Sequence, residues 1–216
     1  MSARPLPRPG FVAMALLVAL LHVSFAPAET LDTLLAQVDS RTISASDVAL
    51  ARALGVFGFA PSSAPIVRAD IDRYVDVLLI LSEASKIGVE AEPAAIDAAW
   101  TGIAVRVGGE AALTQWLEDK AIDRDWARRL VEEDVVRSKF LDARFAAFIF
   151  PDEEAVNREL GPGSHDESAR ERVRERLVRQ AAVEAQDKWL ADARRRASIK
   201  VLLPGAGSLA PPFIGP

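Results

Sequence analysis

LLAQVDSRTISASDV, at residues 34–48, sets the architecture of the whole chain. Leu34–Val38 predicts a short β-strand, Asp39–Arg41 a polar turn and Thr42–Ile43 a second extended piece, which together are typical of a hairpin. Ile199–Leu203, close to the other end of the chain, also predicts a strand. Because an unpaired strand edge is costly, we expect the first and last strands to pair. The result would be a two- or three-stranded sheet that joins both ends of the chain.

Helices fill the interval between these strands. Ser44 and Asp47 approximate a capping box, which predicts a helix over 45–54. After a Gly- and Pro-rich loop, apolar residues at three- and four-residue spacing predict a long helix over 68–87. Further helices are predicted over 93–107, 110–121, 123–147, 151–160 and 166–197. The expected buried side of the helix over 93–107 consists of Ile96, Trp100, Ile103 and Val107. The expected apolar face of the helix over 166–197 consists of Val173, Leu177, Ala181, Ala185, Trp189 and Ala193. The predicted fold class is therefore mostly α with a small sheet.

The composition limits the chemistry of the chain. Of 216 residues, 50% are hydrophobic and 26% charged, which is typical of a globular domain. There is no Cys, so disulfides, thiolate metal sites and Cys nucleophiles are excluded. A formal net charge of -5 argues against a dedicated nucleic-acid-binding protein. We expect no nucleic-acid partner and no cofactor.

The first 28 residues resemble an export signal. Arg4 and Arg8 precede an apolar run over Phe11–Phe25, and Ala26-Pro27-Ala28 provides small residues for cleavage after Ala28. The alternative is a membrane anchor, but the run of about 15 residues is shorter than the ~20 that span a bilayer. No later apolar run reaches that length. We expect a soluble periplasmic protein without an integral membrane span.

The mature chain is expected to be one domain over residues 29–203. Its helical part covers 29–160, a Gly-Pro-Gly-Ser hinge lies within 161–168, and the last helix and strand cover 169–203. The Pro-rich tail, 204–216, is expected to be disordered. An exchange of C-terminal helices between two copies across the hinge, giving a homodimer, stays open.

Several of these stretches resemble SurA-type periplasmic folding factors, whose architecture is related to the peptide-binding region of trigger factor. They are LLAQVDSRTISASDV at 34–48, DIDRYVDVLLILSEASKIGVE at 70–90, EPAAIDAAW at 92–100, RVRERLV at 172–178 and KWLADARRRASIKVL at 188–202. Two features depart from the family. Ser40 stands in the turn where members often have Gly, and Gly161–Ser168 is far too short to hold the parvulin isomerase domain. The resemblance implies ATP-independent, chaperone-like binding of unfolded envelope or outer-membrane polypeptides, without isomerase chemistry.

The polar clusters do not point to an enzyme. Ser164, His165 and Asp166 are adjacent in one loop and cannot form a catalytic triad, so a helix cap is the better interpretation. The acidic runs Glu132–Asp134 and Asp152–Glu154 are better explained by surface ion pairs and by the helix dipole. Ten basic residues over 169–200 are interleaved with five acidic ones, which favours a salt-bridged helix face over a phosphate or lipid surface.

Aromatic and aliphatic residues are the remaining candidates for function. Phe57 and Phe59 lie in the loop between Gly and Pro residues, and Phe148-Ile149-Phe150 lies where a helix ends. They either close the ends of the helix bundle or line an apolar cleft for extended nonpolar segments. The candidate peptide-binding residues are Phe57, Phe59, Tyr74, Leu78, Trp100, Phe145, Phe148 and Phe150. Two alternatives stay open: a prolyl isomerase or its remnant, and a structural envelope subunit with one fixed partner.

Overall fold

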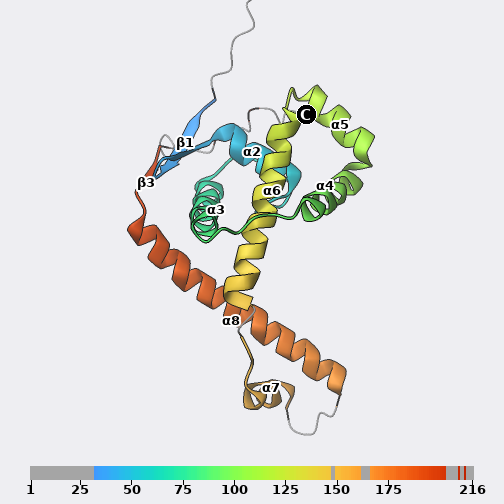
Figure 1. Ribbon diagram of the computed structural model, residues 1–216, viewed down its shortest axis with the longest axis vertical. Helices are drawn as coiled ribbons and strands as arrows, with labels where there is room; N and C mark the ends of the chain where they lie inside the picture. Colours follow the sequence, from blue (N-terminus) through green and yellow to red (C-terminus); the bar gives the residue numbers. More distant parts are fainter. Residues whose placement is uncertain (1–31, 147–148, 162–165, 203–208, 210–211, 213–216) are drawn as a thin grey trace, which may run out of the picture. The chain divides into compact units, whose positions relative to one another are not determined.

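Strands from opposite ends of the described chain lie side by side in one antiparallel sheet. The computed structural model describes residues 32–146, 149–161, 166–202, 209 and 212. In the sheet, β1 (Leu34–Val38) lies between β2 (Arg41–Ser44) and β3 (Ile199–Val201) (Figure 1). Val38 pairs with Arg41 on one side and with Ile199 on the other. The predicted pairing of the first and last strands is therefore confirmed.

The turn between β1 and β2 also fixes the start of β3. Asp39 has a φ of 52°, in the left-handed region that Asp tolerates better than most residues. Its N–H donates to the carbonyl oxygen of Ser198 over 2.8 Å, and its Oδ1 accepts from the N–H of Ser198 over 2.9 Å. One residue thus links the hairpin to the end of the last helix.

Seven α-helices complete the described part of the chain, as the sequence pattern predicted. The capping box of Ser44 and Asp47 is present, with the N–H of Asp47 donating to Oγ of Ser44 over 3.1 Å. Asp123 caps its helix as predicted. The helices are α2 (Ala45–Leu54), α3 (Arg68–Lys86), α4 (Pro93–Val107), α5 (Glu110–Asp119), α6 (Arg124–Leu141), α7 (Glu153–Leu160) and α8 (Glu167–Arg196). The prediction of a mostly helical protein with a small sheet is confirmed.

The helix predicted over 123–147 changes its winding near its end. α6 stops at Leu141, and a π-helical turn, η1 (Asp142–Ala146), follows. Phe140 and Phe145 are five residues apart, and their ring centroids lie 6.4 Å from each other in an edge-on contact. The i to i+5 spacing of a π turn brings residues at this separation onto one side. Both rings also contact Trp189 of α8, at 5.8 Å each.

The core surrounds α3, which is buried on much of its circumference. A second, smaller cluster joins the ends of α3 and α6 to α8 and contains Ile80, Ala84, Phe140, Phe145 and Leu190. Two predicted core positions are corrected by the structure. Ala185 of α8 is exposed, because α3 and η1 cover the later part of that helix, where Leu190 is buried instead. Val107, at the last turn of α4, is 44% exposed.

An ion pair clamps α8 onto α3. Nε of Arg194 donates to Oδ1 of Asp76 over 2.6 Å, and a terminal nitrogen of Arg194 donates to the carbonyl oxygen of Asp72 over 2.7 Å. The pKa of Arg194 is raised, first by its hydrogen bond to Asp76. This contact brings the C-terminal helix back to the helical group, as joining both ends in one sheet requires.

The chain after β3 is partly described. The N–H of Leu202 still donates to the carbonyl oxygen of Leu35 over 2.8 Å, and Leu203 lies outside the described residues. Leu209 is an exception to the expected disorder of the tail, because it forms an antiparallel bridge with Ile66. The predicted signal segment 1–28, hinge residues 162–165 and most of the tail also lie outside the described residues.

Candidate functional site

Five of the candidate peptide-binding residues lie inside the main core. Phe57 and Tyr74 meet edge-on, with ring centroids 5.5 Å apart, and Leu78 belongs to the same cluster. Burial raises the pKa of Tyr74 well above its usual range, and the nearby Asp47 and Glu133 carboxylates add to the shift. Phe59 and Trp100 are also buried there. These side chains fill the core and present almost no surface to a bound peptide in this conformation.

Arginine side chains cover two of these rings. The guanidinium of Arg73 lies 5.4 Å from the ring centroid of Phe59, and that of Arg124 lies 4.8 Å from the ring of Trp100. Nε1 of Trp100 donates to Oε2 of Glu110 over 3.0 Å. Hydrogen bonds from Arg124 and then from Trp100 hold the pKa of Glu110 below its usual range. Trp100 is therefore fixed in place by α5 and α6 partners.

The remaining three candidates, Phe145, Phe148 and Phe150, belong to η1 or follow it in the sequence. Phe145 is buried in the second core cluster, where Arg144 lies over its ring at 5.8 Å. Phe148 lies outside the described residues. Phe150 is 85% exposed. Of the eight residues, Phe150 is thus the one that the structure describes as an open apolar surface.

A different set of residues forms an open groove in the described part of the chain. It has a volume of about 870 Å³ and lies between the first turns of α4 and the second half of α6. Its apolar lining residues, which we call the floor, are Ala95, Ala99, Val135 and, from η1, Ala143. Ala95 and Ala99 are one helical turn apart, and their methyl groups leave space that larger side chains would fill. We call this feature the α4–α6 groove.

The rim of the α4–α6 groove is polar. It consists of Glu92, Asp134, Ser138, Lys139 and Asp142. Nζ of Lys139 donates to Oε1 of Glu92 over 3.0 Å and to the carbonyl oxygen of Glu90 over 2.9 Å, so this side chain joins α6 to the start of α4. With three carboxylates against one ammonium, the rim is net acidic. An apolar floor with a charged rim has the chemistry to hold an extended apolar segment.

Sequence reasoning missed this groove because its floor is made of small residues. The pattern of α4 pointed to the adjacent face, where Trp100 and Ile103 are buried. A weak signal was present: Ala95 and Ala99 lie at i and i+4 beside the charged positions Glu92 and Asp97. That pattern predicts a shallow helix face but does not say which helix lies across it.

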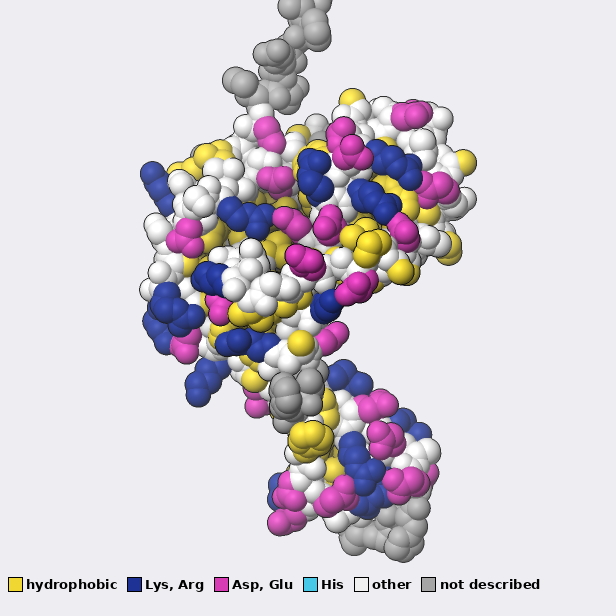
Figure 2. Space-filling model, in the orientation of Figure 1, with side chains coloured by type: hydrophobic (Ala, Val, Ile, Leu, Met, Phe, Trp, Pro, Cys, Tyr) yellow, Lys and Arg dark blue, Asp and Glu magenta, His cyan; other side chains and the backbone are white. Residues whose placement is uncertain are grey.

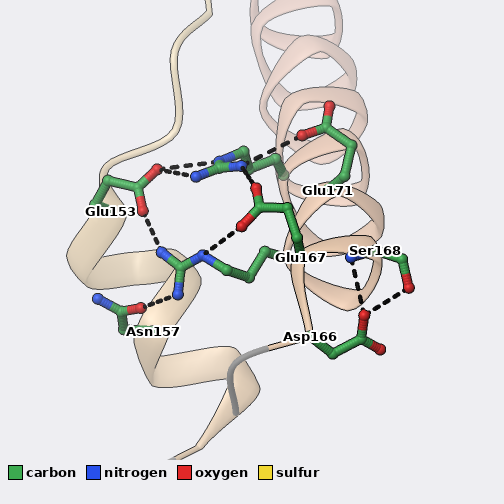
Figure 3. Close-up of polar contacts among 8 residues, drawn as sticks. Glu153, Asn157, Asp166, Glu167, Ser168 and Glu171 are labelled. Atoms are coloured by element: carbon green, nitrogen blue, oxygen red, sulfur yellow. Dashed lines mark hydrogen bonds and ion pairs between the residues drawn. The ribbon is translucent and has the colours of Figure 1, made fainter.

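The acidic run at 152–154 caps α7 and joins it to α8. Asp152 caps α7, and Glu153 faces α8. Oε1 of Glu153 accepts from Arg174 over 2.7 Å, and Oε2 accepts from Arg170 over 2.5 Å (Figure 3). Hydrogen bonds from Arg174 first, and then from Arg170, hold the pKa of Glu153 below its usual range. The carboxylate therefore stays charged at neutral pH and joins the two helices.

The basic residues of α8 form the salt-bridged face that the sequence predicted. Figure 2 shows acidic and basic side chains interleaved over the α7–α8 segment. Arg176 reaches Glu159 of α7 over 2.6 Å, while Arg179 pairs with Glu175 on its own helix over 3.5 Å. Asp166 caps α8, because its carboxylate accepts a hydrogen bond from the N–H of Ser168 (Figure 3). The predicted helix cap is therefore confirmed.

Neither a metal cluster nor a membrane-crossing helix is found in the described residues. No group of three or more His, Asp or Glu side chains there is arranged to hold a metal ion. None of the helices in that part of the chain combines the length and apolar character that a bilayer crossing requires.

Comparison with known proteins does not assign the chain to a family. No protein-family model matches the sequence, and no curated protein matches it either. Function must therefore be argued from the groove and its surroundings.

Proposed function

We propose that this protein is an exported, ATP-independent chaperone that resembles the SurA type and has no isomerase chemistry. It holds extended apolar segments of unfolded envelope or outer-membrane polypeptides against the α4–α6 groove. The segment over residues 1–28 would direct its export. The exposed ring of Phe150 is a second apolar surface that a client could contact.

The observation that carries the proposal is the apolar floor of the groove. Ala95, Ala99, Val135 and Ala143 present methyl-rich surface in a space of about 870 Å³. Burial of apolar area contributes ~25 cal/mol per Å² whatever the identity of the side chain. A shallow apolar floor therefore binds many sequences weakly, which suits a protein that must release its clients without ATP.

The rim explains why the groove would stay open in the absence of a client. The contact between Lys139 and Glu92 is charged and half-exposed, so it is worth little and is easily replaced by water. The charged rim also disfavours collapse of α4 onto α6, because closing the groove would desolvate Asp142 and Lys139. Binding would then cost little reorganisation of the protein.

The proposal is tested by the aggregation of an unfolded outer-membrane β-barrel protein on dilution from urea, followed by light scattering. Equimolar protein, expressed without residues 1–28, should suppress the scattering. Absence of suppression at several-fold excess would overturn the proposal.

A matched pair of variants ties the activity to the groove. Ala95→Glu places a charge on the floor, whereas Ala98→Glu places the same charge on an exposed position of the same helix outside the groove. We expect Ala95→Glu to lose most of the suppression and Ala98→Glu to keep it, with both retaining the helical circular dichroism of the parent. Equal activity of the two variants would locate client binding elsewhere.

A further inference from the structure

A second apolar pocket lies toward the other end of α4 and shares no lining residue with the α4–α6 groove. Its volume is about 390 Å³, and its lining is mostly apolar. The walls come from the end of α2, the following loop, the end of α4 and α5: Ala53, Leu54, Pro61, Ser62, Ser63, Ile103, Val107, Ala112, Leu113 and Trp116. We call it the α4–α5 pocket.

The loop that forms one wall of this pocket is already bound by the tail of the chain. The N–H of Ile66 donates to the carbonyl oxygen of Leu209 over 2.6 Å, and the N–H of Leu209 donates back to Ile66 over 2.9 Å. Ile66 is fully buried, and Leu209 packs against the main core. This reciprocal pair fixes the position of Leu209 beside the loop.

The bridge also fixes the direction of the tail. Because the pairing is antiparallel, the chain leaves Leu209 in the direction of the residues that precede Ile66. Three or four residues before Ile66 lie Ser63 and Ser62, which line the α4–α5 pocket. Four residues after Leu209 lies Phe213. At up to ~3.3 Å per residue, four residues are long enough to reach from the bridge as far as the pocket-lining part of the loop.

The composition of the tail fits an apolar pocket. From residue 201 to residue 216 it carries no charged side chain, and its large apolar residues after Leu209 are Phe213 and Ile214. Pro211 and Pro212 lack the N–H that would continue a β-ladder, so binding beyond the bridge has to come from side chains. The chain bends at Pro212, whose own side chain is exposed.

We propose that Phe213 and Ile214 of this chain occupy the α4–α5 pocket as an intramolecular ligand. The Leu209 bridge aligns the segment, the bend at Pro212 turns it from the loop, and the two side chains bury themselves against Leu113 and Trp116. The pocket is thus a binding site for a short, uncharged, Pro-containing apolar segment. The inference does not depend on client binding in the α4–α6 groove.

The test uses paramagnetic broadening in the otherwise full-length protein. Because the chain has no Cys, Gly215→Cys accepts a single nitroxide label beside the intact Phe213 and Ile214. We expect a strong loss of intensity for the amide of Ala112 and the indole N–H of Trp116. A label at Val183→Cys, an exposed position on α8, serves as the control and should leave these signals unchanged.

Three outcomes would overturn the proposal. The first is broadening of the pocket signals no greater than that from the α8 label. The second is broadening that survives Phe213→Ala with Ile214→Ala in the labelled chain, because the bridge alone would then hold the tail. The third is broadening seen when labelled, isotope-free protein is mixed with unlabelled, isotope-enriched protein, since a second copy would then supply the ligand. Loss of broadening in the double variant and none in the mixture support the intramolecular site.

Discussion

The backbone N–H of Phe57 donates a hydrogen bond to Oδ1 of Asp134 over 2.9 Å, joining the loop after α2 to the middle of α6. Phe57 has a φ of 58° and a fully buried ring. A bulky residue in the left-handed region costs roughly 1–2 kcal/mol, so this conformation needs stabilising contacts. Asp134 supplies one of them, and its side chain also lies at the rim of the α4–α6 groove.

Replacement of Asp134 should therefore destabilise the protein. Asp134→Ala leaves the N–H of Phe57 without its acceptor, and we expect a loss of about 1–3 kcal/mol in the free energy of unfolding. Asp134→Asn retains an acceptor oxygen and should lose less. Urea denaturation measures both, with the exposed neighbour Glu132→Ala as control. Equal stability of the Ala variant and the parent would contradict the role of this bond.

The clamp between α8 and α3 gives a second prediction. Arg194→Ala removes two charge-assisted hydrogen bonds to Asp76 and Asp72, and we expect a loss of about 1.5–3 kcal/mol. The adjacent Arg195 pairs with Asp192 of its own helix at an exposed position, so Arg195→Ala should change stability by less than about 1 kcal/mol. Thermal unfolding of the two variants makes the comparison. A loss of similar size in both variants would mean that the contacts of Arg194 stabilise the protein no more than an exposed ion pair does.

The turn residue Asp39 allows the backbone and side-chain effects to be separated. Asp39→Ala places Ala at a positive φ and also removes the acceptor for Ser198, so we expect a loss of about 1–3 kcal/mol. Asn tolerates the left-handed region and keeps a side-chain oxygen, so Asp39→Asn should stay close to the parent. The free energy of unfolding in urea is the readout. An Asn variant as unstable as the Ala variant would show that the negative charge, rather than the geometry, matters.

The attachment of α7 to α8 should depend on pH. The pKa of Glu153 is lowered in the folded protein, first by Arg174 and then by Arg170. A lowered carboxyl pKa stabilises the folded state above the ordinary Glu value of about 4.3, and this contribution is lost as the pH falls through the lowered pKa. Amides of α7 should therefore lose hydrogen-exchange protection below about pH 4, as judged against intrinsic exchange rates.

A pair of adjacent variants checks this pH dependence. Glu153→Gln removes the titrating group and should abolish the pH-dependent change in α7 protection. Glu154 pairs with Arg158 within α7 itself, so Glu154→Gln should keep the change. Loss of protection with the same pH dependence in the Glu153→Gln variant would show that another group controls the attachment.

The local elements could be predicted because their signals are local. The capping box at Ser44 and Asp47 predicted the start of α2, and the strand character of Ile199–Leu203 predicted β3, whose observed end at Val201 is two residues earlier. The pairing of β1 with β3 followed from a general requirement, since strands need partners. The π turn η1 was not predicted, and it accompanies a contact of Phe145 with Trp189, 44 positions further along the chain, which no local pattern encodes.

The candidate site could not be predicted in the same way. Phe57 and Trp100 are large apolar residues whose positions in the sequence fit a binding surface or a core equally well. The hydrophobic effect is non-directional, so the burial of an apolar side chain leaves no local pattern in the sequence. Whether such a residue lies in the core or at a binding surface depends on which element packs over it. Here the covering elements, with Tyr74 against Phe57 and Arg124 over Trp100, come from distant parts of the chain.

The amino-acid sequence alone determined the helices, their caps, the hairpin and the composition that excludes thiol chemistry, because each depends on residues a few positions apart. Tertiary structure decided which apolar faces are covered and which stay open. The small side chains of Ala95 and Ala99 become a groove because α6 lies across them at a distance that their methyl groups do not fill. That distance is set by the packing of many larger side chains elsewhere in the core, and no local pattern encodes it.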